Sequence, residues 1–236
     1  MIEVKTISLN FGSHFTLQSG EFTIEKGLWA LVGRNGSGKS TFLKALMGKT
    51  ELKKGTIKLN QKEIKMWDSA NLSKQLSVVY PKPNVFGNLS VKDVVLLGRI
   101  PYANAFGKIG KNDETIAEEA LAILNLSHLG EKLFTQLSDG EKQMVMIARV
   151  IAQNTPYIIL DEPTAFLDVV NRLKIIKMLK KIVQEHQKII IFSTHDIEVI
   201  PKLCDGLIWI KDNQLNSSHT RSEFAAIIEG LFENEV

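Results

Sequence analysis

Glycine, lysine and serine stand between residues 33 and 41 at a spacing that suits the phosphate chain of a nucleotide. The segment reads GRNGSGKST, and its glycines lack a Cβ, so the backbone can curl around an anion and point N–H groups at it. Lys39 can reach the β- and γ-phosphates as a positive charge, and the Ser40 hydroxyl can ligate Mg²⁺. The expected contact residues are Gly33, Asn35, Gly36, Ser37, Gly38, Lys39, Ser40 and Thr41.

The segments on both sides of this loop have the character that a phosphate-binding loop requires. Residues 29–32 form a short apolar run typical of a buried strand, and residues 41–47 have helical spacing that stops at Gly48. A helix that begins near Lys39 adds the positive end of its dipole to the site. This strand–loop–helix order predicts a P-loop that binds a nucleotide.

Two acidic residues and one histidine follow other predicted strands. Asp161 and Glu162 end the apolar run 157–160, and open α/β sheets bind ligands at the carboxyl ends of their buried parallel strands. Asp161 can hold Mg²⁺, and Glu162 can polarise an attacking water, as phosphoryl transfer requires. His195 follows the predicted strand 188–194 and is expected beside the γ-phosphate. The alternatives are a plain helix cap for the acids and an ordinary turn for the histidine.

The sequence LSDGE at 137–141 opens a predicted helix that extends to about residue 153. Ser138 and Asp139 are favoured cap residues, and Glu141 suits the first turn of a helix. On composition alone, an ordinary capped helix explains this pattern.

An aromatic ring close to the P-loop could stack on the base of the nucleotide. Phe11 lies on the turn between the first predicted strands, 22 residues before Gly33. Phe15 is the rival candidate, and an edge or core position is the alternative role for Phe11.

The other segments supply the elements that must position these residues. The predicted elements are strands at 2–9, 15–26 and 76–80, hairpins at 53–64 and 206–218, and helices at 171–186 and 220–232. On the helix 171–186, the side chains expected to face inward are Leu173, Ile176, Leu179 and Ile182. Residues 90–153 instead predict an all-helical insertion in an α/β chain.

Composition narrows the class of protein. The 236 residues suit one domain, with or without a subdomain, and the net charge of +3 gives no reason to expect a nucleic-acid partner. Cys204 is the single cysteine, which excludes a disulfide framework. The sequence contains no run of 18 apolar residues, so no membrane-spanning helix is expected, and the first residues lack the pattern of a signal sequence.

Together these motifs resemble those of the ATP-binding-cassette (ABC) ATPase family, and the resemblance covers essentially the whole chain. Residues 33–41 are similar to the Walker A motif and residues 157–163 to the Walker B motif. LSDGE resembles the family signature, usually LSGGQ, with Asp139 in place of a glycine. Three further matches remain. Residues 164–168 resemble the D-loop and end in Asp168, His195 stands at the position of the switch histidine, and Phe11 at that of the A-loop aromatic.

The resemblance implies an α/β fold, a RecA-like P-loop NTPase core with an antiparallel β-subdomain and a helical subdomain. The core and β-subdomain are expected at 1–86 and 154–236, and the helical subdomain at 87–153. The implied activity is ATP hydrolysis with ATP and Mg²⁺ bound.

The resemblance also implies roles for single residues. Lys39 is expected to bind phosphate, Glu162 to act on water and His195 to sense the γ-phosphate. The expected metal ligands are Ser40 and Asp161. The residues expected to contact the nucleotide of a second copy are Ser138, Asp139 and Gly140, and the D-loop Asp168 is expected near the nucleotide.

The partners implied by the resemblance are a second copy of the chain in the ATP-bound state, an integral membrane permease and, indirectly, a substrate-binding protein. The permease is expected to dock near residues 81–105, which places the chain peripherally at the cytoplasmic face of the plasma membrane. GRIPY at 98–102, with EPTAFLD, resembles importers of iron–siderophore, haem or cobalamin type. The alternatives are a soluble ABC ATPase without a transport role and a regulatory subunit that does not hydrolyse ATP.

One position departs from the pattern of the family. A glutamine that ligates the metal usually follows the proline after the strand 76–80, and Lys82 stands there in this chain. A lysine ammonium has three donors and no acceptor, so it cannot ligate a cation. We therefore expect this chain to handle Mg²⁺ differently.

Overall fold

The computed structural model describes residues 1–11, 15–81, 86–104 and 106–232, except for the side chain of Phe11. Lys82 therefore lies outside the described residues. The chain divides into two compact units: unit 1 joins Met1–Asp68 to the segment from Asn171 onward, and unit 2 is Ser69–Val170. The segment 87–153, which the sequence predicts as the helical subdomain, lies within unit 2.

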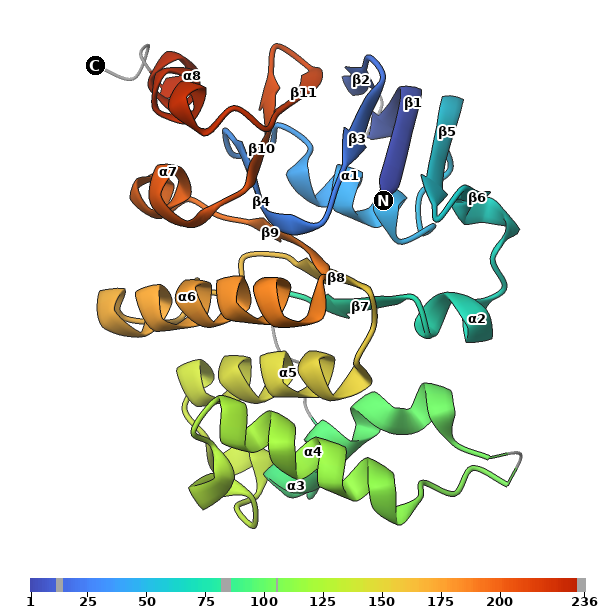
Figure 1. Ribbon diagram of the computed structural model, residues 1–236, viewed down its shortest axis with the longest axis vertical. Coiled ribbons are helices and arrows are strands. Elements are labelled where there is room, and N and C mark those ends of the chain that lie inside the picture. The colour runs from blue at the N-terminus through green and yellow to red at the C-terminus, as the bar shows by residue number, and fades with distance from the viewer. Residues whose placement is uncertain (12–14, 82–85, 105, 233–236) are drawn as a thin grey trace. The chain divides into compact units, whose positions relative to one another are not determined.

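Unit 1 contains a mixed sheet with the strand order β6-β5-β1-β2-β11-β10-β4-β9, and β3 pairs with β1 (Figure 1). The strands are β1 (Ile2–Phe11), β2 (Phe15–Ser19), β3 (Phe22–Ile24), β4 (Gly27–Gly33), β5 (Lys54–Leu59), β6 (Lys62–Glu63), β9 (Ile189–Ser193), β10 (Gly206–Lys211) and β11 (Gln214–Ser218). Strand β4 is parallel to both β10 and β9, whereas β1 is antiparallel to β2, β3 and β5. This arrangement confirms the predicted α/β core with antiparallel strands.

Strand β4 is the central element of this sheet for the site. All seven of its residues are buried, as expected for a strand covered on both faces. The Trp29 ring lies directly over Gly206 of β10, where an added Cβ would come within 2.3 Å of the indole. Glycine at 206 therefore allows β10 to pair with β4 beneath the ring.

The helices of unit 1 are α1 (Lys39–Leu46), α6 (Val169–His186, from Asn171 onward), α7 (Ile200–Leu203) and α8 (Phe224–Phe232). On α6, three of the four residues predicted to face inward are buried, namely Ile176, Leu179 and Ile182. Leu173 is 37% exposed, so its predicted burial is wrong. At about 100° per residue, Leu173 falls on the lysine-bearing side of α6, while Ile175 and Val183 complete the buried stripe.

Unit 2 combines two parallel strands with a group of helices. The strands are β7 (Leu76–Val79) and β8 (Tyr157–Leu160), and the helices are α2 (Ser69–Ser73), α3 (Val91–Leu96), α4 (Lys111–Ile123) and α5 (Asp139–Gln153). Figure 1 shows α3, α4 and α5 side by side. A short 3₁₀ helix, Leu97–Tyr102, continues α3, and Gly98 passes so close to α5 that a Cβ there would lie 2.3 Å from the Arg149 carbonyl oxygen.

None of the helices in the described part of the chain combines the length and the apolar character needed to span a lipid bilayer.

Candidate nucleotide-binding site

The predicted P-loop connects β4 to α1 in unit 1 and has the backbone geometry of an anion cradle. Gly36 and Gly38 have φ angles of 75° and 105°, a region that side chains rarely allow. Gly38 is the N-cap of α1 and has no side chain to occupy the amides of the first turn. The first turn therefore offers its N–H groups and its positive dipole end to an anion.

Lys39 lies in this loop with its ammonium turned back onto the backbone. Its Nζ donates to the Gly33 carbonyl oxygen at 2.7 Å and to the Arg34 carbonyl oxygen at 3.2 Å, and the residue is only 7% exposed. A lysine that holds these two carbonyls fixes the start of the loop. To reach a phosphate, the ammonium has to exchange carbonyl acceptors for phosphate oxygens.

The switch histidine candidate stands at the same sheet edge as the P-loop. β9 runs parallel to β4, with Ser193 opposite Leu31, and the Thr194 N–H donates to the Leu31 carbonyl oxygen at 3.3 Å. The hydroxyl of Thr194 accepts from the Asp196 N–H at 2.9 Å, which fixes the turn that contains His195. His195 is exposed at the end of this strand.

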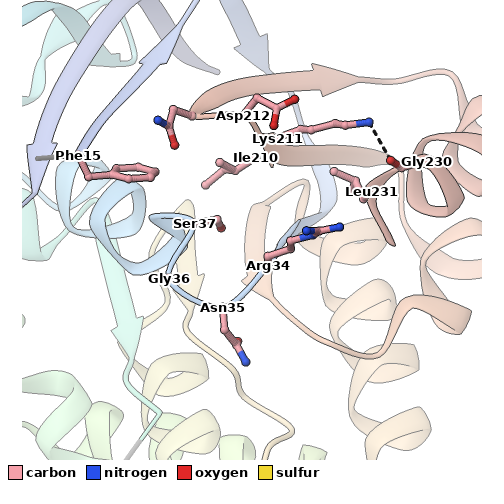
Figure 2. A pocket seen from close by; sticks show the side chains of 11 residues that line it. Phe15, Arg34, Asn35, Gly36, Ser37, Ile210, Lys211, Asp212, Gly230 and Leu231 are labelled. Carbon is pink, nitrogen blue, oxygen red and sulfur yellow. Dashed lines mark hydrogen bonds between the residues drawn. The ribbon is translucent and has the colours of Figure 1, made fainter. Parts of the chain in front are cut away.

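A cavity of about 300 Å³ lies against the first half of the P-loop (Figure 2). Its lining comes from the loop, from the β10–β11 turn, from α8 and from the start of β2: Phe15, Arg34, Asn35, Gly36, Ser37, Ile210, Lys211, Asp212, Asn213, Gly230 and Leu231. The Lys211 ammonium donates to the Gly230 carbonyl oxygen at 2.8 Å, which ties the hairpin to the end of α8. Sequence reasoning missed this hairpin and α8 as neighbours of the loop.

In the sequence, the signal for this hairpin is the residue pair Asp212-Asn213. In the structure both residues have positive φ angles, as the turn of a two-residue hairpin requires. That signal predicts the hairpin but not its place beside the P-loop, because the pairing of β10 with β4 decides that place.

The role of Phe11 in stacking on the base stays a prediction. The backbone of Phe11 pairs with that of Phe15 at the end of β1, but the Phe11 side chain lies outside the described residues. Phe15, the rival, is half-buried and points into the cavity beside the loop in Figure 2. The cavity is lined by residues 34–37 rather than by the helix start at Lys39.

The two acidic residues of the Walker B segment are in unit 2, at the carboxyl end of β8. Asp161 is 8% exposed, and its N–H donates to the Val79 carbonyl oxygen of the neighbouring strand at 2.9 Å. Glu162 has a φ angle of 49°, which is uncommon for a residue with a side chain and often marks functional sites. The Glu162 carbonyl oxygen accepts from the Ala165 N–H at 3.2 Å, so the chain turns sharply here into the D-loop that ends at Asp168.

The signature segment is also in unit 2, where it begins α5. Ser138 is the N-cap, and its side chain and that of Glu141 form a reciprocal capping box. Hydrogen bonds from the backbone N–H and the hydroxyl of Ser138 lower the pKa of the Glu141 carboxyl. A Cβ on Gly140 would come within 3.3 Å of both Leu167 and Phe166, so the signature and the D-loop are neighbours within unit 2.

The predicted site residues thus fall into two sets. Unit 1 holds the P-loop residues and His195, and unit 2 holds Ser138, Asp139, Gly140, Asp161, Glu162 and Asp168. Among the described residues there is no cluster of three or more His, Cys, Asp or Glu that could hold a metal on its own. An exposed Ser40 hydroxyl and a buried Asp161 carboxylate are hard oxygen donors, the ligand type that Mg²⁺ takes together with phosphate oxygens.

Comparison with known proteins identifies a family and related folds. The family model described as ABC transporter matches residues 17–165, which is more than half of the chain. A petrobactin import ATP-binding protein of Bacillus subtilis is 34% identical over 99% of this chain and 93% of its own length.

Two solved structures share the fold over nearly the whole chain. A dimeric ATP-binding cassette in a post-hydrolysis state, bound to ADP and Pi, has a TM-score of 0.79 at 26% identity and covers 93% of this chain and 98% of its own. The cbiO1 protein of Clostridium perfringens, part of the ABC transporter complex cbiONQ, has a TM-score of 0.82 at 27% identity. The match covers 99% of this chain and 94% of that protein's chain.

Proposed function

Because the chain belongs to the ABC transporter family, we propose that it is the ATP-hydrolysing subunit of an importer for an iron complex or cobalamin. The observation that carries the proposal is the P-loop itself. Its left-handed glycines, its uncapped helix start and Lys39 form an anion cradle at the sheet edge where His195 follows β9.

The residues of the cradle are proposed to bind the triphosphate of ATP. The amides of the first turn of α1 and the Lys39 ammonium take the phosphate oxygens, and His195 contacts the γ-phosphate. Glu162 orients the attacking water and takes up its proton, which is the role of the catalytic carboxylate in phosphoryl transfer. The bond between the γ-phosphorus and its bridging oxygen then breaks, which leaves ADP and inorganic phosphate.

Ser40 and Asp161 are the residues that would hold Mg²⁺. The ion would neutralise charge on the β- and γ-phosphates when bound. The chain's own contribution is to present one hydroxyl at the start of α1 and one carboxylate at the end of β8.

The active assembly is proposed to be a head-to-tail pair of chains. The P-loop of one copy and the Ser138, Asp139 and Gly140 segment of the other hold each ATP between them. The dipole of α5 then adds positive charge near the γ-phosphate. One related cassette that is dimeric with ADP and Pi bound supports the pairing of two chains.

The proposed class of cargo is inferred from the names of related proteins. The petrobactin import protein matches almost end to end, which favours transport over a soluble ABC ATPase without a transport role. The segment 98–102 gives the same indication from the sequence. In this role the chain works at the cytoplasmic face of the membrane, docked on permease subunits that receive cargo from a substrate-binding protein.

The test is ATP-dependent uptake into proteoliposomes. The chain is reconstituted with the permease encoded beside it, and uptake of a ferric siderophore, of haem and of cobalamin is measured in parallel. Uptake of one cargo that needs ATP and stops with Lys39→Ala is the expected result. ATP hydrolysis without uptake of any of the three would contradict the proposed import role.

A further inference from the structure

One polar side chain of α5 is completely buried and makes no hydrogen bond within the part of the chain that the structure describes. Gln143 is 0% exposed, although its neighbours Lys142 and Met144 are partly exposed. Neither its amide oxygen nor its amide nitrogen has a hydrogen-bond partner among the described residues. Glutamine is mostly found at protein surfaces, and buried polar groups are nearly always bonded, so this side chain requires an explanation.

A second glutamine on the same helix shows the ordinary arrangement. Gln153, at the other end of α5, is half-buried. Its amide nitrogen donates to the Ser73 carbonyl oxygen at 2.7 Å and to the Leu76 carbonyl oxygen at 3.4 Å, which ties α5 to the start of β7. The surroundings of α5 can therefore satisfy a glutamine amide, and the unpaired amide is particular to the position of Gln143.

The face of α5 that carries Gln143 is next to the D-loop. A Cβ on Gly140 would lie 3.3 Å from both the Phe166 carbonyl oxygen and the Leu167 side chain. Gln143 follows Gly140 by three residues, which places it about 60° around the helix and about 4.5 Å further along the axis. The buried amide therefore lies on the side of α5 that the D-loop covers.

The D-loop is joined to the proposed catalytic carboxylate by two successive turns. The Ala165 N–H donates to the Glu162 carbonyl oxygen at 3.2 Å. The Leu167 N–H donates to the Thr164 carbonyl oxygen at 3.1 Å. A group that fixes the D-loop backbone therefore also fixes the backbone from which the Glu162 side chain projects.

We propose that Gln143 is a positioning residue for ATP hydrolysis, and that its amide hydrogen-bonds the D-loop backbone when two chains close on ATP. A buried amide without a partner is costly, because it has given up its bonds to water and gained none. A shift of the D-loop that supplies a partner recovers this cost and holds Glu162 in one orientation toward the attacking water. The inference rests on the proposed function and on the proposed pair of chains.

The test replaces Gln143 by methionine, an unbranched apolar side chain of similar size. Gln143→Met should leave the melting temperature of the isolated chain unchanged or raise it, because an apolar group of the same shape removes an unpaired polar group. The same variant should lower kcat for ATP hydrolysis about ten-fold, which is the effect of one lost hydrogen bond in the reacting state. The KM for ATP should not change, because the P-loop is in unit 1 and stays intact.

Gln153→Met is the matched control on the same helix. It removes an amide that is bonded in the folded chain, so its melting temperature should fall while kcat stays normal. The two variants are thus expected to show opposite patterns of stability and rate. Gln143→Leu repeats the test with a second apolar side chain in case the methionine variant does not fold.

Amide hydrogen exchange tests whether the D-loop is the bonded segment. In a Glu162→Gln background with ATP, exchange at residues 164–168 should be faster when Gln143 is methionine than when it is glutamine. Equal exchange in the two proteins would overturn the D-loop as the partner.

The outcomes separate this inference from the proposed function. An unchanged kcat in the folded Gln143 variants would overturn the positioning role and leave the ATPase function intact. A marked fall in the melting temperature would also overturn it, because the amide would then have a partner, such as a buried water, in the isolated chain. Absence of ATP hydrolysis by the unaltered chain would overturn the proposed function together with this inference.

Discussion

Ser138 and Glu141 hold each other across the first turn of α5. The backbone N–H and the hydroxyl of Ser138 both donate to the Glu141 carboxylate at 2.8 Å, and the Glu141 N–H donates to the Ser138 hydroxyl oxygen at 3.3 Å. The helix that is proposed to receive the γ-phosphate of a second chain therefore begins with an internal anion. Before the Ser138 hydroxyl can donate to a phosphate, it has to leave this carboxylate.

We predict that Ser138→Ala lowers thermal stability at neutral pH and that the loss shrinks in acid. The hydrogen bonds from Ser138 lower the pKa of Glu141 in the folded state, so they stabilise the fold above the unfolded pKa and lose this effect as the pH falls through the folded pKa. Loss of such a cap costs about 1 kcal/mol. Melting curves from pH 7 down to pH 3 measure the difference, with Ser222→Ala as an exposed control. A pH-independent difference would contradict the assigned cause.

We predict that Lys39→Ala abolishes ATP hydrolysis while the chain stays folded. The substitution removes a cation from a loop, although this side chain is buried on its own backbone carbonyls rather than exposed. Loss of one preorganised charge at a phosphoryl centre lowers the rate by at least about a hundred-fold. A phosphate-release assay gives the rate, and circular dichroism checks the fold. A near-normal rate would remove Lys39 from the phosphate site.

We predict that the chain is largely monomeric without nucleotide and that Glu162→Gln forms a stable dimer with ATP. The substitution removes the carboxylate that acts on water, so the closed pair is trapped before hydrolysis. Light scattering with and without ATP measures the mass. Ser138→Ala in the same background should weaken the dimer, and an unchanged mass upon ATP addition would argue against the head-to-tail pair.

We predict that Lys82→Gln lowers the Mg²⁺ concentration needed for hydrolysis. A unit charge about 6 Å from a divalent ion is repelled by roughly 5 kcal/mol at an effective dielectric of about 20, before nearby phosphates cancel part of it. A glutamine removes this repulsion, and its amide oxygen can ligate the ion. Titration of the ATPase rate with Mg²⁺ at fixed ATP compares the two proteins. Superimposable curves would mean that the metal does not sense this position.

Short-range patterns in the sequence by themselves determined the local backbone structure at several sites. The glycine spacing of 33–41 and the Ser138 cap act over a few residues, and the structure shows the P-loop backbone and the helix start at Ser138 that they predict. Such features depend on steric limits and local hydrogen bonds, which one segment carries by itself.

Only the tertiary structure decided which distant segments meet. The pairing of β4 with β9 brings His195 to the sheet edge of the P-loop, and the pairing with β10 brings the hairpin turn to the same place. The burial of Arg99 between α4 and α5, the exposure of Leu173 and that of Phe106 likewise follow from packing. Residue type and spacing do not encode these relations, because each depends on contacts with segments tens of residues away, and those contacts exist only once the whole unit has folded.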